Sequence, residues 1–101
     1  MRASCLDDYI FICLLNGKWW TYWQLQEVIN EKVGKFYGEP TISASIRNIR
    51  KIERRRKYKL PLDMNKEVVQ RSSIEGSKGY QYRLNLNENE LSQIKERLNG
   101  K

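Results

Sequence analysis

Two strand-like runs in the second half of the chain limit the possible fold more than any other feature. Residues 68–74 and 79–85 are rich in strand-forming residues, and the stretch Glu-Gly-Ser-Lys that joins them is typical of a turn. In the second run, Tyr80, Tyr82 and Leu84 alternate with polar residues. Successive side chains of a strand point to opposite faces of a sheet. The spacing therefore predicts a β-hairpin with one buried face.

The residues before the hairpin have the apolar spacing of amphipathic helices. We expect helices at about residues 5–16, 22–33 and 42–56, with a brief extended stretch at 18–20 between the first two. Ser4 with Asp7 resembles a capping box for the first helix, and Thr21 and Thr41 are the expected N-caps of the second and third. Residues 57–67 include Pro61 and are expected to form a loop.

A further helix is expected after the hairpin, at about residues 88–98. Asn87 and Glu90 have the spacing of a cap at its start. Leu91, Ile94 and Leu98 form a single apolar stripe along it. This stripe either packs on the first helix of the same chain or forms the interface of a homodimer, and the sequence favours neither alternative.

The positive charge of the chain is concentrated in one segment. The 101 residues carry a formal net charge of +7. Residues 47–59 contain eight basic side chains and one acidic side chain, Glu53, so the rest of the chain is neutral. A charge excess confined to one segment is the pattern expected of a protein that binds a polyanion.

The composition argues against several classes of enzyme and binding protein. The chain has no histidine, which excludes Ser-His-Asp and Cys-His nucleophile pairs and Cys2His2 zinc sites. It has no P-loop and no GxGxxG motif. Its longest apolar run, residues 9–15, is too short to span a bilayer, and its first residues lack the pattern of a signal peptide. We therefore expect a soluble cytoplasmic protein without catalytic activity, cofactor, bound metal or membrane contact.

The order helix, short strand, helix, turn, helix, hairpin is that of a winged helix-turn-helix domain. We predict an α+β fold of this type for a single domain over residues 1–101, and the resemblance covers residues 5–86. The stretches YGEPTISASIRNIRK (37–51) and GYQYRL (79–84) also resemble small helix-turn-helix proteins encoded by bacteriophages and prophages. The resemblance implies a DNA-binding protein whose third helix and hairpin contact the duplex.

The side chains of the third helix fit the recognition role that the resemblance implies. Its isoleucines Ile42, Ile46 and Ile49 share one face, and the opposite face is basic. Arg47 could pair with guanine and Asn48 with adenine, with a solvated helix face as the alternative interpretation. The candidate base-reading residues are Ser43, Ala44, Arg47, Asn48 and Lys51.

Other polar residues are candidates for contacts with the DNA backbone. In the hairpin, Arg71 and Arg83 are expected to point outward, and Lys78 at the tip could reach a minor groove or a phosphate. Ordinary capping or solvation is the alternative for the serines and for Lys78. The candidate backbone contacts are Thr41, Ser45, Arg54, Arg55, Arg56, Lys57 and Lys59.

The aromatic residues near the second helix are interpreted as core rather than as stacking platforms for single-stranded nucleic acid. Either Trp19 or Trp20 is expected to be the exception, because adjacent strand residues face opposite ways. The group consists of Trp19, Trp20, Trp23, Phe36 and Tyr37.

Three functional hypotheses follow from these patterns. The first is a sequence-specific double-stranded DNA-binding protein, a transcriptional regulator of phage or prophage origin. The second is an interaction module that binds a phage or host protein, such as a repressor or a replication factor, through Trp20 and the C-terminal stripe. A metal-dependent enzyme that uses Asp7, Asp8 or Asp63 is disfavoured, because adjacent carboxylates on a helix diverge by about 100°.

Overall fold

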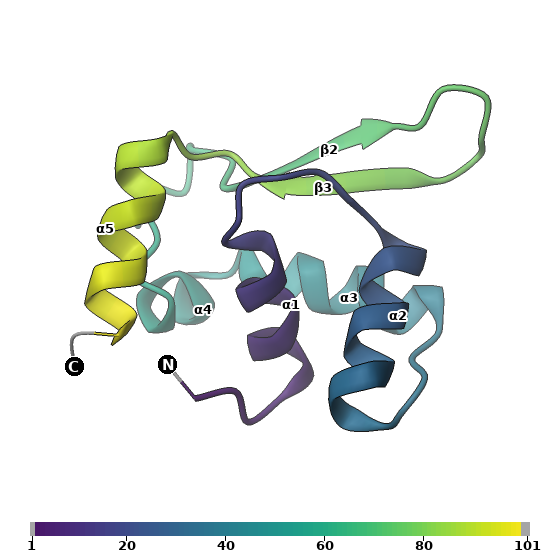
Figure 1. The fold of residues 1–101 in the computed structure, drawn as a ribbon. Helices are drawn as coiled ribbons and strands as arrows, with labels where there is room; N and C mark the ends of the chain where they lie inside the picture. The colour runs from purple at the N-terminus through teal and green to yellow at the C-terminus, as the bar shows by residue number, and fades with distance from the viewer. Residues whose placement is uncertain (1, 100–101) are drawn as a thin grey trace.

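In the computed structural model, which describes residues 2–99, a three-stranded antiparallel sheet lies along one side of a group of helices (Figure 1). The fold is α+β, and β3 lies between β1 and β2. The helix α5 stands at one end of the molecule and the hairpin tip at the other. The elements are α1 (Leu6–Leu14), β1 (Trp20–Thr21), α2 (Tyr22–Val33), α3 (Glu39–Ile49), α4 (Ile52–Lys57), β2 (Val69–Ser73), β3 (Tyr80–Leu84) and α5 (Glu88–Asn99).

Local capping chemistry defines two of the helices as predicted. At the start of α2, the Thr21 hydroxyl accepts from the backbone N–H of Gln24 (3.2 Å), and the Gln24 side chain accepts from the Thr21 amide (2.9 Å). Asn87 and Glu90 make the same reciprocal pair of bonds at α5, at 2.8 and 3.0 Å. The predicted cap of α1 is wrong, because Ser4 donates to Asp8 rather than capping with Asp7.

The predicted single helix over residues 42–56 is two helices in the structure. The first, α3, begins at Glu39 with Gly38 as its N-cap and Pro40 in its first turn, where proline is well tolerated. Thr41 therefore lies inside the helix, and its prediction as N-cap is wrong. The chain then leaves helical geometry at Lys51, whose ψ of 151° is extended, and α4 starts at Ile52.

The core lies between the helices and the inner face of the sheet. Ile42, Ile46 and Ile49 of α3 are buried in it, as their spacing predicted. Phe11 of α1 stacks on Tyr58, which follows α4, with ring centroids 4.1 Å apart. This contact between distant parts of the sequence fixes α1 against the end of α4.

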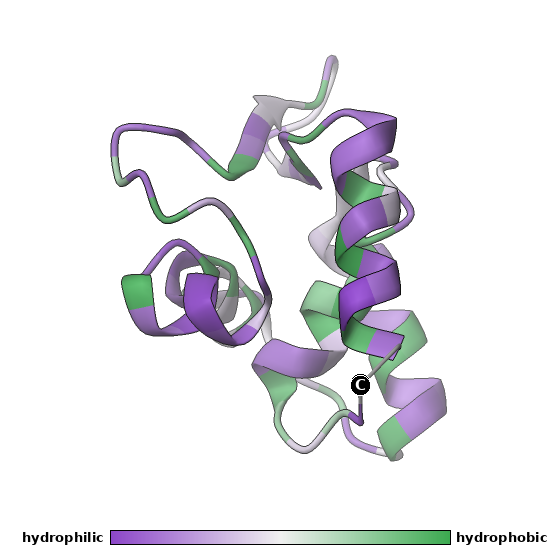
Figure 2. Ribbon diagram, turned by 90° about the vertical axis from the view of Figure 1, so that its left-hand side faces the viewer, coloured by the Kyte–Doolittle hydropathy of each residue, from purple (hydrophilic) through white to green (hydrophobic). Residues whose placement is uncertain are grey.

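The apolar stripe of α5 belongs to this same core. Leu91 and Ile94 are buried, and Leu98 packs against the core cluster. Figure 2, which views the molecule from the α5 end, shows hydrophobic residues interspersed with hydrophilic ones along this helix. The prediction of this stripe as a possible homodimer interface is therefore wrong, because the chain covers the stripe itself.

Several aromatic residues predicted to be core lie at the surface. Trp23 is 43% exposed and Phe36 is 67% exposed, so the core interpretation is wrong for both. Trp19 and Trp20 are both half-buried, so neither is the exposed tryptophan that the sequence predicted at this position. Trp20 shares the inner face with its strand partner Tyr82, whereas the ring of Trp19 is covered by the guanidinium of Arg83 at 4.5 Å.

Candidate nucleic-acid interface

A cleft of about 330 Å³ opens between α3 and the inner face of the hairpin. The helix side contributes Glu39, Ser43, Ile46, Arg47 and the adjoining Arg50, and the strands contribute Arg71, Tyr80 and Tyr82. Three arginines from two separate segments of the sequence therefore meet at one concave surface. Among residues 2–99, Glu39 is the only acidic residue that lines it. The cleft is consequently a site of positive charge next to the exposed face of α3.

Arg71 faces this cleft, so its prediction as an outward-pointing residue is wrong. The strand register pairs Arg71 with Tyr82, and paired residues of antiparallel strands share one face of the sheet. The Arg71 guanidinium lies 4.5 Å from the centroid of the Tyr80 ring, in a cation–π contact. Arg83 lies on the opposite face of the sheet, where its Nε donates to the side chain of Gln70 at 2.7 Å.

The face of α3 that points away from the core carries the predicted base-reading residues. Arg47 and Lys51 are exposed, and Ser43, Ala44 and Asn48 are half-buried. Lys51 is the N-cap of α4 rather than part of α3, but it directly follows Arg50, the C-cap of α3. These five residues therefore lie on or beside one accessible surface.

Ser45 does not belong to that surface, and its prediction as a phosphate contact is wrong. Ser45 lies three residues after Ile42 and four before Ile49, so it falls on the core face of the helix. Its side chain is buried, and its hydroxyl donates to Oδ1 of Asp7. Thr41, by contrast, is exposed in the first turn of α3.

Half of the basic cluster at residues 47–59 is engaged by acidic or carbonyl groups of the same chain. Arg54 pairs with Asp7 at 2.8 Å, and Lys57 pairs with Asp8 at 2.9 Å. Arg50 pairs with Glu67 at 2.9 Å. Only part of the basic segment that the sequence predicted to bind a polyanion is therefore available at the surface. The cluster members that are exposed and form no ion pair within residues 2–99 are Arg47, Lys51, Arg56 and Lys59.

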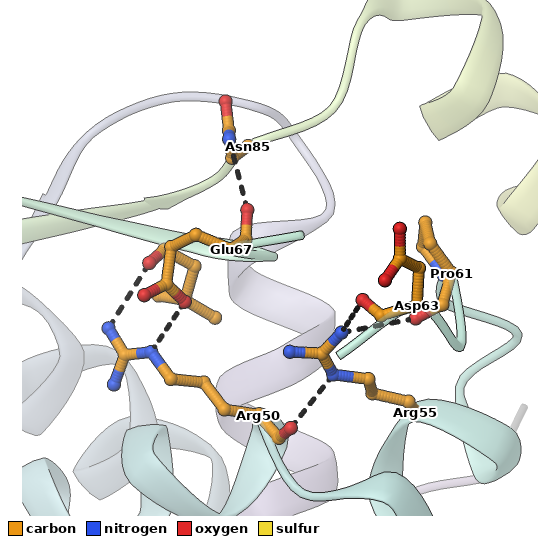
Figure 3. A network of polar contacts seen from close by, with 7 residues as sticks. Arg50, Arg55, Pro61, Asp63, Glu67 and Asn85 are labelled. Carbon is orange, nitrogen blue, oxygen red and sulfur yellow. Dashed lines mark hydrogen bonds and ion pairs between the residues drawn. The ribbon is translucent and has the colours of Figure 1, made fainter. Parts of the chain in front are cut away.

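Arg55 is a structural residue, and its prediction as a backbone contact is wrong. It is 3% exposed, and Nε donates to the carbonyl of Arg50 at 2.8 Å (Figure 3). One terminal nitrogen donates to the carbonyls of Asp63 (2.8 Å) and Pro61 (3.4 Å). A guanidinium has five donors in a fixed plane, which lets one side chain satisfy several carbonyls of an irregular loop. Arg55 thus holds the loop after α4 in place.

Arg50 connects the end of α3 to the start of β2. Its Nε donates to Glu67, and a terminal nitrogen donates to the carbonyl of Val69 at 3.1 Å (Figure 3). Asn85, after β3, donates to the carbonyl of Glu67 at 3.0 Å. These bonds set the separation between the helix and the hairpin, and hence the width of the cleft. Arg50 was not among the predicted site residues, although its spacing of three from Arg47 places the two on neighbouring positions of the helix surface.

Two carboxylates of α1 neutralise part of the cluster from the core side. Burial alone would raise the pKa of Asp8, but hydrogen bonds from Tyr58 (2.7 Å) and Ser4 (3.0 Å) and the charge of Lys57 hold it well below its usual range. Burial, with the bond to Asp8, raises the pKa of Tyr58 well above its usual range. Within residues 2–99, no group of three or more His, Cys, Asp or Glu residues is placed to hold a metal ion.

The hairpin tip lies beside the start of α2. Lys78 is exposed at the tip and lines a small pocket with Tyr22, Trp23 and Glu39. Gly79 approaches Trp23 so closely that an added Cβ would lie 3.3 Å from its ring. Trp23, a surface residue, therefore supports the tip and keeps it near the N-terminal end of α3.

Comparisons with known proteins found no relative: no protein-family model matches this chain, and neither a search of curated proteins nor a search of solved structures returned a match. Among the described helices, none combines the length and the apolar character needed to cross a membrane. The basis for a functional proposal is therefore the geometry of the cleft and of the exposed face of α3.

Proposed function

We propose that this chain is a sequence-specific double-stranded DNA-binding protein of the winged helix-turn-helix type. In this proposal α3 enters the major groove, and the hairpin lies on the adjacent groove or backbone. The observation that carries the proposal is the cleft in which Arg47 and Arg71 face one concave surface between helix and hairpin, beside Arg50, which is paired with Glu67. A helix that enters a major groove has a phosphate backbone on either side, so cations flanking the helix are placed where the duplex is most negative.

The order of the elements supports the same proposal. A helix, a short strand, three helices and a hairpin follow one another, and the short strand pairs with the second hairpin strand. In a helix-turn-helix pair the second helix is the one that reads DNA, which here corresponds to α3 after α2, and the short α4 lies between α3 and the hairpin. The resemblance of residues 37–51 and 79–84 to phage and prophage proteins favours a regulator of transcription.

The residues of this surface have proposed roles that follow from their chemistry and position. Arg47 forms paired hydrogen bonds with the O6 and N7 of guanine, and Asn48 pairs with adenine. Lys51 and Arg71 contact phosphates on the two sides of the cleft. Lys78 contacts a phosphate or the minor groove from the hairpin tip.

Two observations weigh against the alternative of a pure protein-binding module, because both surfaces first considered for it are at least partly covered by the chain itself. Trp20 packs against the core and donates from its indole nitrogen to Asn16 at 3.1 Å. The C-terminal stripe is likewise covered by its own chain. DNA binding is therefore the function that the described surface supports best.

Selection from a random duplex library, followed by fluorescence anisotropy titrations of selected and scrambled DNA, tests the proposal. We expect a defined motif that binds about 10³-fold or more tightly than scrambled DNA. Arg47→Ala should cost about 1–3 kcal/mol on the selected DNA and relax the base preference at one position. Lys95→Ala removes the same charge from α5, outside the cleft, and should leave the preference unchanged. Absence of any motif, or equal losses for Arg47→Ala on both DNAs, would contradict sequence reading.

A further inference from the structure

The loop that follows α4 presents two apolar side chains to solvent. Leu62 is 49% exposed and Met64 is 56% exposed, two residues apart. Isolated exposed apolar residues are common on protein surfaces. Leu62 and Met64 differ from such isolated residues because the backbone of their loop is held by hydrogen bonds. Arg55 binds the carbonyls of Pro61 and Asp63, and the Asp63 carboxylate accepts from the Asn65 amide at 2.9 Å. A loop that is fixed in advance loses less conformational entropy when a partner binds.

A groove of about 180 Å³ lies directly beside this loop, between residues 59–61 and α5. It is smaller than the pockets that usually hold small-molecule ligands, and its lining is half apolar and half polar or charged, a mixture that suits the side chains of another protein. Of its charged residues, Glu90 is already bonded to Lys66 and to the Asn87 amide. The side chains of Lys59 and Arg97 give the rim of this groove a positive charge. The groove is lined by Lys59, Leu60, Pro61, Leu86, Glu90, Gln93, Ile94 and Arg97.

The loop and the groove are complementary in chemistry. The loop carries one carboxylate, Asp63, between two apolar side chains, and the groove carries apolar residues beside two cations. Pro61 belongs to the loop and also lines the groove, so the two features are adjacent on the surface of the molecule. A two-fold symmetric interface uses the same patch on both subunits, and such a patch must therefore be complementary to itself.

We propose that this face joins two copies of the chain. The loop at residues 61–65 of each copy docks into the groove of the other, with Leu62 and Met64 against the apolar residues of the groove, such as Leu86. Asp63 then lies near Lys59 and Arg97 of the opposite copy. The groove adjoins α5, at the far end of the molecule from the hairpin tip (Figure 1), so the α3 cleft of each copy stays open. This interface does not depend on what the cleft binds.

Sedimentation velocity of the full chain without DNA tests this interface. Over a dilution series from about 1 mM to about 1 µM, the range in which small interfaces dissociate, we expect a reversible shift from dimer to monomer. Leu62→Ser combined with Met64→Ser leaves the loop carbonyls in place for Arg55 and should raise the dissociation constant at least about tenfold. Ile12→Ser changes an exposed apolar residue on α1 and should leave it unchanged.

Two further variants test the charge complementarity between the loop and the groove. Asp63→Asn keeps an oxygen that can accept from the Asn65 amide but removes the charge, and Arg97→Glu reverses one rim charge. Both should weaken the dimer, and Asp63→Asn should also reduce its dependence on salt. A chain that stays monomeric at about 1 mM, or a dimer that none of these variants weakens, would overturn the proposal. DNA binding is measured separately, so its success or failure does not affect this result.

Discussion

At the scale of single residues, identical side chains next to one another in sequence have opposite roles. Arg55 is buried and holds a loop, whereas its neighbour Arg56 is exposed on α4. The difference arises because successive residues of a helix are separated by about 100°, so only one of the two faces the loop. The charge of a basic run therefore does not show which of its members are available to a ligand.

Arg55→Ala should destabilise the protein, and Arg56→Ala should not. Removing the Arg55 guanidinium deprives the carbonyls of Arg50 and Asp63 of a charged donor, which we expect to cost about 2–3 kcal/mol. The exposed Arg56 should change the free energy of unfolding by less than about 0.5 kcal/mol. Urea unfolding of both variants measures the difference. Equal effects would show that the Arg55 network contributes nothing particular to stability.

At the scale of elements, the break between α3 and α4 is held from outside the helices. The two carboxylate oxygens of Asp7 accept from Ser45 on α3 and from Arg54 on α4, so one side chain of α1 spans the break. Arg55 binds the Arg50 carbonyl at the break itself. The apolar spacing of residues 42–56 continues through this point, which is why the sequence predicted one helix.

Stability should decline at both acidic and alkaline pH through the contact between α1 and Tyr58. The pKa of Asp8 is lower in the folded than in the unfolded chain, so its contribution is present above about pH 4 and is lost as the pH falls further. The pKa of Tyr58 is raised on folding, so its contribution is present below about pH 10 and is lost as the pH rises.

Thermal unfolding of the wild type and of Asp8→Asn across this pH range checks both statements. The variant should be less stable at neutral pH and should lose less of its stability on acidification, since the amide that replaces the carboxylate has no proton to gain. A variant whose acid transition parallels that of the wild type would place the pH dependence elsewhere in the chain.

A side chain at Gly17, in the turn between α1 and β1, should destabilise the protein more than one at Gly76 in the hairpin tip. Gly17 has φ 75°, and a Cβ there would lie 2.9 Å from Cδ1 of the buried Leu91 of α5. Gly76 in the hairpin tip has nearly the same φ of 77° but no atom within 4 Å of such a Cβ. Gly76→Ala should therefore cost about 1–2 kcal/mol for its backbone alone, and Gly17→Ala at least about 1 kcal/mol more. Chemical denaturation measures the loss of stability in both variants. Equal losses would mean that α5 moves away from the added Cβ without a cost in stability.

At the scale of the whole molecule, folding divides the basic cluster between internal partners and the surface. Asp7 and Asp8 of α1 and Glu67 before β2 each take one cation of the cluster. The exposed cations near the cleft and hairpin come from several elements, namely Arg47, Lys51, Arg71 and Lys78. The proposed DNA surface is therefore assembled by the tertiary structure rather than contained in one segment.

The salt dependence of DNA binding should reflect this smaller set of cations. Each neutralised phosphate contributes about −0.9 to the slope of log K against log salt, so the three cations proposed to contact phosphates, Lys51, Arg71 and Lys78, give a slope near −2.7. If all eight cations of the cluster bound phosphates, the slope would be about −7. Anisotropy titrations at several salt concentrations distinguish the two values. A slope at the steeper of these values would mean that the internal ion pairs open when DNA binds.

The sequence by itself determined the elements whose signals are local. Thr21 with Gln24 and Asn87 with Glu90 start helices through bonds three residues apart, and the alternation at Tyr82 and Leu84 marks a half-buried strand. The isoleucine face of α3 follows from helical spacing in the same way. Each of these features depends only on neighbours in the chain.

Only the tertiary structure decided the face of Arg71, the break after α3 and the internal role of Arg55. Arg54 meets a carboxylate 47 residues away, and Tyr58 meets one 50 residues away. The face of Arg71 depends on the strand register, which a shift of one residue would reverse. A pattern of neighbouring residues contains no information about partners at such separations. The residues that remain available to a ligand are therefore set by folding.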